Sequence, residues 1–390
     1  MKRYIVFILW LVHFTLFGQD DESEKPKKFT LKGYVKEMAS LNALGDSLMF
    51  QNLIHNRLNF AWYPNKHFTF YAEFRNRLIT GDFVSEVPGY AELINSNNDY
   101  FDLSANLIES NNAVLNVMAD RLYMQWAKNN WEIKAGRQRI NWGVNLAWNP
   151  NDWFNAYSFY DFDYEERPGS DAVRIIHYTG AASSVEVASK FSRDIDHYVG
   201  AAMWKINKWN YDIQLLGGFA QGDLALGTGW AGNLGNAGFK GEFTYFHNVT
   251  QTTVNSSYDN MVLSAISADY SFPSSLYFNA SIMYNSNGSL HPDFGFGTFL
   301  LRPGTVRDVS PYKWSSFLQS SYQISPLFYA SIALIGYPGS DSFFVNPGLT
   351  ISVKQNLDLD LIGQLFYGND AQGDFSSILK AGYVRVKWSF

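Results

Sequence analysis

One segment of the chain, residues 139–169, concentrates the residue types that could bind or select a solute. It contains nine aromatic side chains, including Trp142 and Trp148. Its charged residues are Asp152, Asp161, Asp163, Glu165, Glu166, Arg139 and Arg167. Aromatic faces stack on sugar-like or apolar solutes, and fixed charges select among solutes. We interpret the segment either as a constriction folded against a channel wall or as a structural loop whose rings anchor at a membrane interface.

Arginines in and beside this segment could meet its carboxylates. They are Arg137, Arg139, Arg167 and Arg174. Paired charges near a pore would create a transverse field that filters solutes, or they could be salt bridges that only pin the loop. The acids at 161, 163, 165 and 166 could hold a calcium ion, but they lack the glycine and the ligand series of a known calcium loop. A solvated acidic edge is favoured, and no metal site is predicted.

Catalytic patterns are weak in this sequence. A serine hydrolase needs a nucleophile, a nearby histidine and an orienting partner. His55 or His177 could sit on an inward wall, but nothing marks a matching serine and no GxSxG elbow occurs. Zinc-binding HExxH and phosphate-cradling glycine motifs are also absent. The sequence predicts a protein without enzymatic activity or cofactor, and a barrel lipase is the minor alternative.

Residues 1–30 contain an apolar segment followed by a charged one. Lys2 and Arg3 precede an apolar stretch over residues 4–17, which predicts a secretory signal peptide over residues 1–18. Residues 19–30 are charged and contain proline, so we expect a flexible periplasmic leader. Removing the signal changes the charge balance from 30 minus 36 to 28 minus 36, which is −8. An acidic chain argues against nucleic acid, and the absence of cysteine excludes disulfides and thiolate metal sites.

Residues 31–390 show the alternation of transmembrane β-strands. Phe68, Phe70 and Phe74 fall on one face of a strand, while Arg75 and Arg77 fall on the other. Similar runs of about 10 residues, the length that crosses a bilayer at a tilt, recur along the chain. The sequence predicts an all-β, antiparallel, up-and-down transmembrane barrel in which inward positions mix both charges. These positions are Arg57, Arg75, Arg77, Arg385, Lys387, Glu73, Asp212, Glu242, Asp358 and Asp360.

The spacing of turns sets the expected strand number. Short turns are predicted at 64–66, 128–130, 180–183, 207–209, 234–237, 273–275, 325–326 and 355–356. With a first strand over 31–37 and a last over 376–390, they give about 18 strands with both ends in the periplasm. Sixteen would follow if the glycine-rich hairpin around 222–238 did not span the membrane. Long connections over 38–50, 80–115, 139–169 and 288–310 are expected at the extracellular rim or in the lumen.

The last strand resembles the terminal signal that barrel assembly machinery reads in outer-membrane proteins. Val384, Val386, Trp388 and Phe390 alternate with polar residues, and the chain stops on the aromatic ring of Phe390. The resemblance implies that Trp388 and Phe390 direct barrel assembly.

A second resemblance lies in the distinctive segment. Gly-Arg-Gln at 136–138, Trp142-Gly143, Asn149-Pro150 with Asp152, and Asp-Tyr-Glu-Glu-Arg-Pro at 163–168 resemble a pattern in alginate-export-type barrels and related outer-membrane porins. Such exporters line the lumen with arginine, and the mixed inward charges here depart from that.

Together these features predict an outer-membrane porin of a Gram-negative bacterium that passes small hydrophilic solutes, such as sugars or oligosaccharides, by diffusion. The alternative is a barrel component of polysaccharide export or protein secretion. Its partners would be outer-membrane lipid, the assembly machinery and a small solute. The sequence leaves open a monomer or a homotrimer, the solute, the direction of transport and the ion selectivity.

Overall fold

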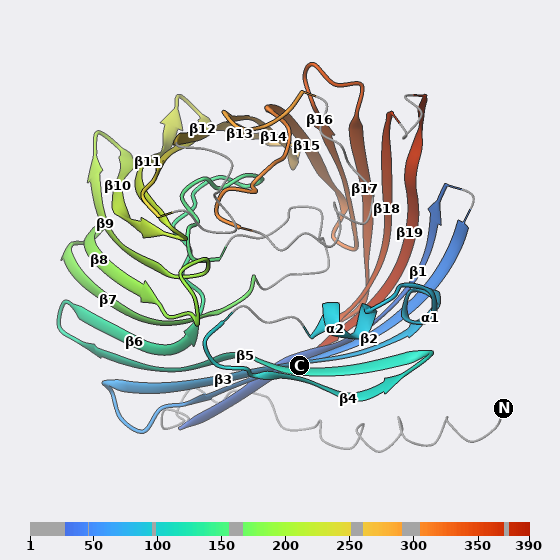
Figure 1. Ribbon diagram of the computed structural model, residues 1–390, viewed down its shortest axis with the longest axis horizontal. Coiled ribbons are helices and arrows are strands. Elements are labelled where there is room, and N and C mark those ends of the chain that lie inside the picture. Colours follow the sequence, from blue (N-terminus) through green and yellow to red (C-terminus); the bar gives the residue numbers. More distant parts are fainter. Residues whose placement is uncertain are drawn as a thin grey trace.

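The computed structural model describes residues 28–45, 47–95, 99–155, 167–250, 260–290, 305–369 and 374–390. The predicted signal peptide and nearly all of the predicted leader lie outside these ranges. The described chain forms an antiparallel sheet (Figure 1). Its strands are β1 Phe29–Leu44, β2 Ser47–Trp62, β3 Phe68–Gly81, β4 Ser104–Ser110, β5 Ala113–Lys128, β6 Trp131–Gln138, β7 Ser170–Gly180, β8 Ser183–Lys190, β9 Val199–Lys208, β10 Tyr211–Ala220, β11 Asp223–Leu234, β12 Ala237–Asn248, β13 Asn260–Ser271, β14 Leu276–Asn285, β15 Trp314–Ser325, β16 Phe328–Gly336, β17 Phe343–Lys354, β18 Leu357–Asn369 and β19 Phe375–Ser389.

The sheet closes on itself into a barrel of 18 strands, as the alternation predicted. Closure is made by β1 and β19, which pair from Tyr34 with Ser389 to Ala43 with Lys380. The short strand β4 lies outside this ring, because β3 and β6 pair with β5 directly and β4 pairs only with the first half of β5. Closure leaves no unpaired edge around the ring, as the backbone requires in lipid.

The eight predicted short turns all join strand pairs at one rim, where β1 begins and β19 ends. The β11–β12 hairpin is a full part of the wall, paired from Asp223 with Asn248 to Leu234 with Ala237. This pairing overturns the alternative of sixteen strands.

Two connections at the opposite rim differ from the prediction. Residues 38–50 are not a long loop, because β1 runs to Leu44 and β2 begins at Ser47. Residues 80–115 contain the helices α1 Asp82–Glu86 and α2 Tyr90–Ile94 as well as β4. Within the described ranges, neither helix has the length and hydrophobicity to span a membrane.

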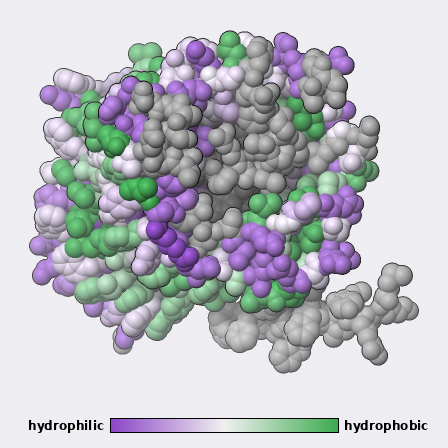
Figure 2. Space-filling view, viewed as in Figure 1, coloured by the Kyte–Doolittle hydropathy of each residue, from purple (hydrophilic) through white to green (hydrophobic). Residues whose placement is uncertain are grey.

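Side chains sort by face along each strand. On β19, Val384, Val386 and Trp388 are exposed on the outer face, and Arg385 on the inner face pairs with Asp360 of β18. Figure 2 shows many apolar side chains on the visible outer wall, with polar side chains among them. An apolar outer wall around a polar interior is the architecture of bacterial outer-membrane barrels.

Candidate functional site

Residues 139–155, the inner loop, run inside the ring of strands between β6 and β7 (Figure 1). A loop with so many aromatic rings would lose stability in solvent, and here its largest side chains are buried. Trp142 and Trp153 are each 1% exposed, and Ile140, Trp148 and Phe154 are also buried. Residues 139–155 therefore lie against the inner wall, as the first of the two interpretations of this segment expects, and their role as a constriction stays a prediction.

One carboxylate holds the inner loop to the wall. Glu242, on the inner face of β12, accepts backbone N–H groups from Val144 at 2.6 Å, Asn145 at 2.9 Å and Asn151 at 2.8 Å. A carboxylate can accept several hydrogen bonds, and charge makes each stronger than a neutral one. Three backbone donors that would otherwise be unsatisfied in a buried turn are thus satisfied by one side chain.

A second anchor joins the start of the loop to β8. The indole Nε1 of Trp142 donates to Glu186 Oε1 at 2.6 Å. The same carboxylate is paired with Arg174 of β7 through contacts of 2.6 and 2.7 Å. Arg174 therefore neutralises the acceptor that orients Trp142.

Two glycines on β11 make room for the end of the loop. A Cβ atom at Gly227 would lie 2.8 Å from Asn151 Oδ1 and 3.0 Å from a ring carbon of Trp153, and one at Gly229 would lie 3.0 Å from Asn151 Nδ2. The Asn151 amide can therefore donate to the Thr228 carbonyl at 3.0 Å. The glycines that weakened the strand pattern of this hairpin are thus the places where the loop contacts the wall.

The loop reaches as far as β13 and β15. Asn145 accepts a hydrogen bond from Ser267 of β13 at 2.6 Å. The Trp148 ring packs edge-on against Phe317 of β15 at a centroid distance of 6.2 Å. The loop therefore covers the inner wall from β8 to β15.

Of the predicted carboxylates in residues 139–169, Asp152 is the one that lies within the described residues. It is 4% exposed, and its Oδ2 lies 3.3 Å from Nη1 of Arg167. Burial raises the pKa of Asp152 to about 7, although Arg167 and Arg139 oppose this effect. A carboxyl that titrates near neutrality thus lies in the loop inside the lumen.

One group of charged pairs lies on the wall opposite β12. In a ring of 18 strands, β2 lies nine strands from β12. Arg57 of β2, 1% exposed, contacts Glu73 at 2.5 Å and Asp120 at 2.8 Å. The bulge between β3 and β5 at Glu73 and Phe74 brings Asp120 to this inner face. Lys36, Arg75 and Arg77 lie beside these pairs on β1 and β3, so cationic groups gather on this side.

Arg137 does not belong to this group of charged pairs, because it lies at the end of β6. It forms a paired contact with Asp171 at 2.9 Å through two nitrogens, and it also donates to the Phe101 carbonyl. Asp171 accepts the Phe101 N–H at 2.7 Å. Residues 99–103 thus cover this ion pair at the end of β6 and β7, and Arg137 is 3% exposed. Sequence alone did not indicate this cover.

A further segment folds inward beside the inner loop. Arg307, between β14 and β15, pairs with Asp223 of β11 at 2.6 Å, and both are buried. Its guanidinium lies 5.8 Å from the Phe246 ring, which contacts Trp153. The long connection expected over 288–310 is described from residue 305 onward, and this end of it packs inside the barrel.

The predicted candidates Asp161, Asp163, Glu165 and Glu166 lie outside the described residues. Across the described ranges, no group of three or more His, Asp or Glu is placed to hold a metal ion. His177 does not face inward, because it pairs with Trp131 on the outer face at a ring distance of 4.3 Å. His55 is buried beside Tyr34 at 5.4 Å. The two histidines thus lie on opposite faces of the wall.

Comparison with known proteins supports the fold. No family model matches the chain, and no curated protein is detectably similar to it. Its structure is similar to Pseudomonas aeruginosa OccK11 (OpdR), with a TM-score of 0.56 and 10% identity over 93% of this chain and 96% of that one. OccK8 (OprE) of the same organism gives 0.57 and 9% over 93% and 98%, and OccD3 (OpdP) gives 0.52 and 9% over 92% and 91%. The resemblance to alginate-export-type barrels stays a prediction.

Fold and interior together define a class. Closed barrels of 16 to 18 strands are of porin size and enclose an aqueous channel. With an apolar outer wall, charged groups on the inner wall and this closed ring, the chain is a transmembrane β-barrel with the fold of a porin.

Proposed function

We propose that this barrel is a porin-like channel through which small hydrophilic solutes diffuse across the outer membrane, and that the inner loop narrows its lumen. The observation that carries the proposal is the three-fold anchoring of the loop on Glu242, inside a closed barrel and opposite the charged pairs of β2. A solute would then pass between the loop, which is fixed to one wall, and the opposite wall.

The groups around that passage favour a polar solute. Arg57 and Asp120 are buried in one wall, and Glu73, whose side chain is 23% exposed, is the member of this charged set that a solute could contact. Sugars and oligosaccharides suit such a path, because hydroxyl groups exchange hydrogen bonds with charged side chains without needing one net charge.

Conductance tests the proposal. Deleting residues 142–164 should raise the single-channel conductance in planar bilayers, because the loop would no longer occupy part of the lumen. Trp209→Ala, in the short β9–β10 turn, is the control that removes an aromatic ring far from the loop and should leave conductance unchanged. Circular dichroism would verify that both variants keep the barrel. Equal conductance and ion selectivity in the deletion variant and the wild type would rule out the constriction.

Export and catalysis require different measurements. A polysaccharide or protein export component should copurify with a partner in mild detergent, whereas a diffusion channel should pass sugars when purified alone. A barrel lipase should release fatty acid from phospholipid.

Barrel assembly machinery is expected to insert the chain through its last strand, where Trp388 and Phe390 lie on the outer face.

A further inference from the structure

Two tyrosines stack on the inner wall, on the periplasmic side of Glu73. Tyr71 of β3 and Tyr123 of β5 are strand partners, and their rings lie nearly parallel with centroids 4.7 Å apart. Both face inward, because Phe70 and Met124, their neighbours in the chain, are exposed on the outer face. The inner loop covers the wall from β8 to β15, so the two tyrosines border the passage that it leaves.

One face of the Tyr123 ring borders a notch in the wall. Tyr71 covers the other face, and the next strand, β6, places Gly136 beside Tyr123. Gly136 has a φ of +118°, and a Cβ atom there would lie 3.2 Å from Cβ of Tyr123, so the position requires glycine. Among the described residues, Tyr71 supplies the one ring that stacks on Tyr123. The face of Tyr123 beside Gly136 is therefore open to a solute.

Polar groups lie on the periplasmic side of this notch. Gln125 and Lys134 are the next inward residues of β5 and β6, and they are strand partners. Lys134 Nζ contacts Glu132 Oε1 at 2.8 Å, and Gln125 Nε2 donates to Glu132 Oε2 at 3.3 Å. Within the described chain these contacts leave two N–H groups of Lys134 and the acceptor Oε1 of Gln125 unused. We call Tyr123, Gly136, Gln125 and Lys134 the tyrosine notch.

The groups of the tyrosine notch suit one ring of a neutral saccharide. A pyranose ring has a face of C–H groups that packs on an aromatic ring, and its hydroxyls both donate and accept hydrogen bonds. Lys134 and Glu132 neutralise each other in their 2.8 Å pair, so the notch does not select a net charge. A wholly apolar solute would leave the ammonium and amide groups without partners, which is unfavourable once water is displaced. A saccharide satisfies both the ring and the polar groups.

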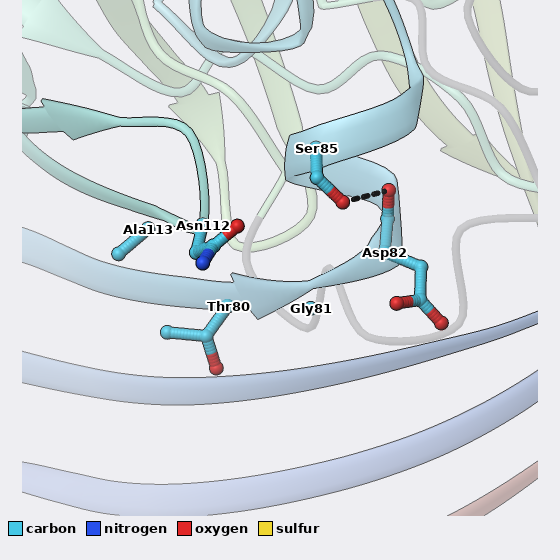
Figure 3. A pocket seen from close by; sticks show the side chains of 6 residues that line it. All are labelled: Thr80, Gly81, Asp82, Ser85, Asn112 and Ala113. Atoms are coloured by element: carbon cyan, nitrogen blue, oxygen red, sulfur yellow. Dashed lines mark hydrogen bonds between the residues drawn. The ribbon is translucent and has the colours of Figure 1, made fainter.

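A pocket at the extracellular rim offers only half of this chemistry. It has a volume of about 800 Å³ and lies at the end of β3, where it is lined by Thr80, Gly81, Asp82, Ser85, Asn112 and Ala113 (Figure 3). Its hydroxyl, amide and carboxylate groups can bind sugar hydroxyls, but none of its lining residues is aromatic. The rim pocket therefore lacks the apolar face that Tyr123 supplies, and it provides a control site.

We propose that the tyrosine notch is a saccharide-binding subsite in the periplasmic half of the passage. The proposal rests on the proposed channel function and names the residues that hold its solute. Tyr123 lies five residues from the periplasmic end of β5, so a sugar that moves inward is held there last, and a sugar that enters from the periplasm is held there first. Tyr71 is a positioning residue, because it supports the far face of the Tyr123 ring.

Current recordings from single channels in planar bilayers test the subsite. Raffinose, maltotetraose and cellotetraose, added separately, should interrupt the wild-type current for resolvable times, because a held sugar obstructs ions. Tyr123→Leu removes the ring but keeps an apolar side chain, and it should shorten the interruptions at least tenfold. Gln125→Leu should shorten them several-fold. Two controls should leave them unchanged: Tyr329→Leu, on the same inward face of β16 as buried Ala333, and Asn112→Ala, in the rim pocket.

The side from which sugar is added gives a second readout, which a merely structural role of Tyr123 would not affect. Sugar at the periplasmic side should interrupt the wild-type current more often than the same concentration at the extracellular side. Equal frequencies from both sides, or equal interruption times in wild type and Tyr123→Leu, would overturn the subsite. A channel that passes the three sugars in a liposome-swelling assay without any interruption would also overturn it, while the channel function would stand. A barrel that does not conduct would overturn both.

Discussion

Glu242 Oε2 lies 2.8 Å from the backbone nitrogen of Asn151, and the two residues are 91 positions apart in the chain. The other carboxylate oxygen accepts the N–H groups of Val144 and Asn145. Three backbone N–H groups of the inner loop therefore depend on one side chain of the wall, which makes Glu242 an informative residue to change.

Replacing Glu242 with glutamine should loosen the inner loop. The amide keeps one acceptor oxygen and places an NH₂ group against backbone donors, so at least one of the three backbone hydrogen bonds is lost and its donor is left unsatisfied. Single-channel recordings should show higher conductance or frequent steps between levels. Asp358→Asn is the control, because Asp358 is an inward carboxylate that accepts from Ser352 at 2.7 Å on a distant wall. Identical recordings from wild type and Glu242→Gln would contradict the anchoring role.

Replacing Gly227 with leucine should displace the end of the loop. The added Cβ would start 2.8 Å from Asn151 Oδ1, and the rest of the side chain would occupy the position of Trp153. Conductance should rise as it does for Glu242→Gln. Gly217→Ala on β10 is the matched control, because its Cβ would only touch Leu226 at 3.6 Å. If Gly227→Leu conducts like Gly217→Ala, the glycines do not position the loop.

The strands of this barrel could be predicted because alternation is a local property. All 18 ring strands and the eight short turns follow from it. The ends of β1 and β2 are not marked by alternation, because Met38 and Met49 face inward while Leu41 and Leu48 face outward, so both faces carry apolar side chains there. Alternation cannot mark a strand whose two faces are alike.

Contacts within the site could be predicted only in part. The aromatic content of residues 139–155 indicated a packed segment, but Glu242 appeared only as one inward acid among several. Its partners are backbone N–H groups, which carry no sequence signal. Gly227 and Gly229 weaken the strand pattern of their hairpin because they have no side chains. The same lack of side chains leaves space for the distant inner loop.

Removing the Arg57 charge should shift the ion selectivity toward cations. Arg57→Gln leaves Glu73 and Asp120 without their nearest cation on the inner wall. Breaking one partner of a buried ion pair typically costs about 3 kcal/mol or more, so the melting temperature should also fall. Reversal potentials in a salt gradient would measure the selectivity. The double variant Arg57→Gln with Asp120→Asn should return toward the wild type, and a reversal potential that stays at the single-variant value would refute the pairing.

Changing Phe390 should reduce assembly more than stability. The backbone of Phe390 exchanges hydrogen bonds with Gly33 at 2.9 and 3.0 Å, and these do not require the ring. Phe390→Ser should therefore lower the amount of barrel in the outer membrane several-fold, while the purified, refolded protein melts within a few degrees of wild type. Ser389→Ala is the control for a neighbouring change. A normal membrane yield for Phe390→Ser would show that the ring is not read during assembly.

Docking of the inner loop should weaken as pH rises through about 7. The Asp152 carboxyl titrates near 3.8 when it is free and near 7 in the docked loop, because burial disfavours its charge. Between these values the docked loop binds more protons, so docking is most favourable below pH 4 and loses that advantage as Asp152 ionises. A shift of this size corresponds to roughly 4 kcal/mol. Hydrogen exchange of the Val144, Asn145 and Asn151 amides, corrected for intrinsic rates, should show greater protection at pH 5.5 than at pH 8. Asp152→Asn should reduce the difference, and equal protection of the wild type at both values would show that Asp152 ionises without disturbing the loop.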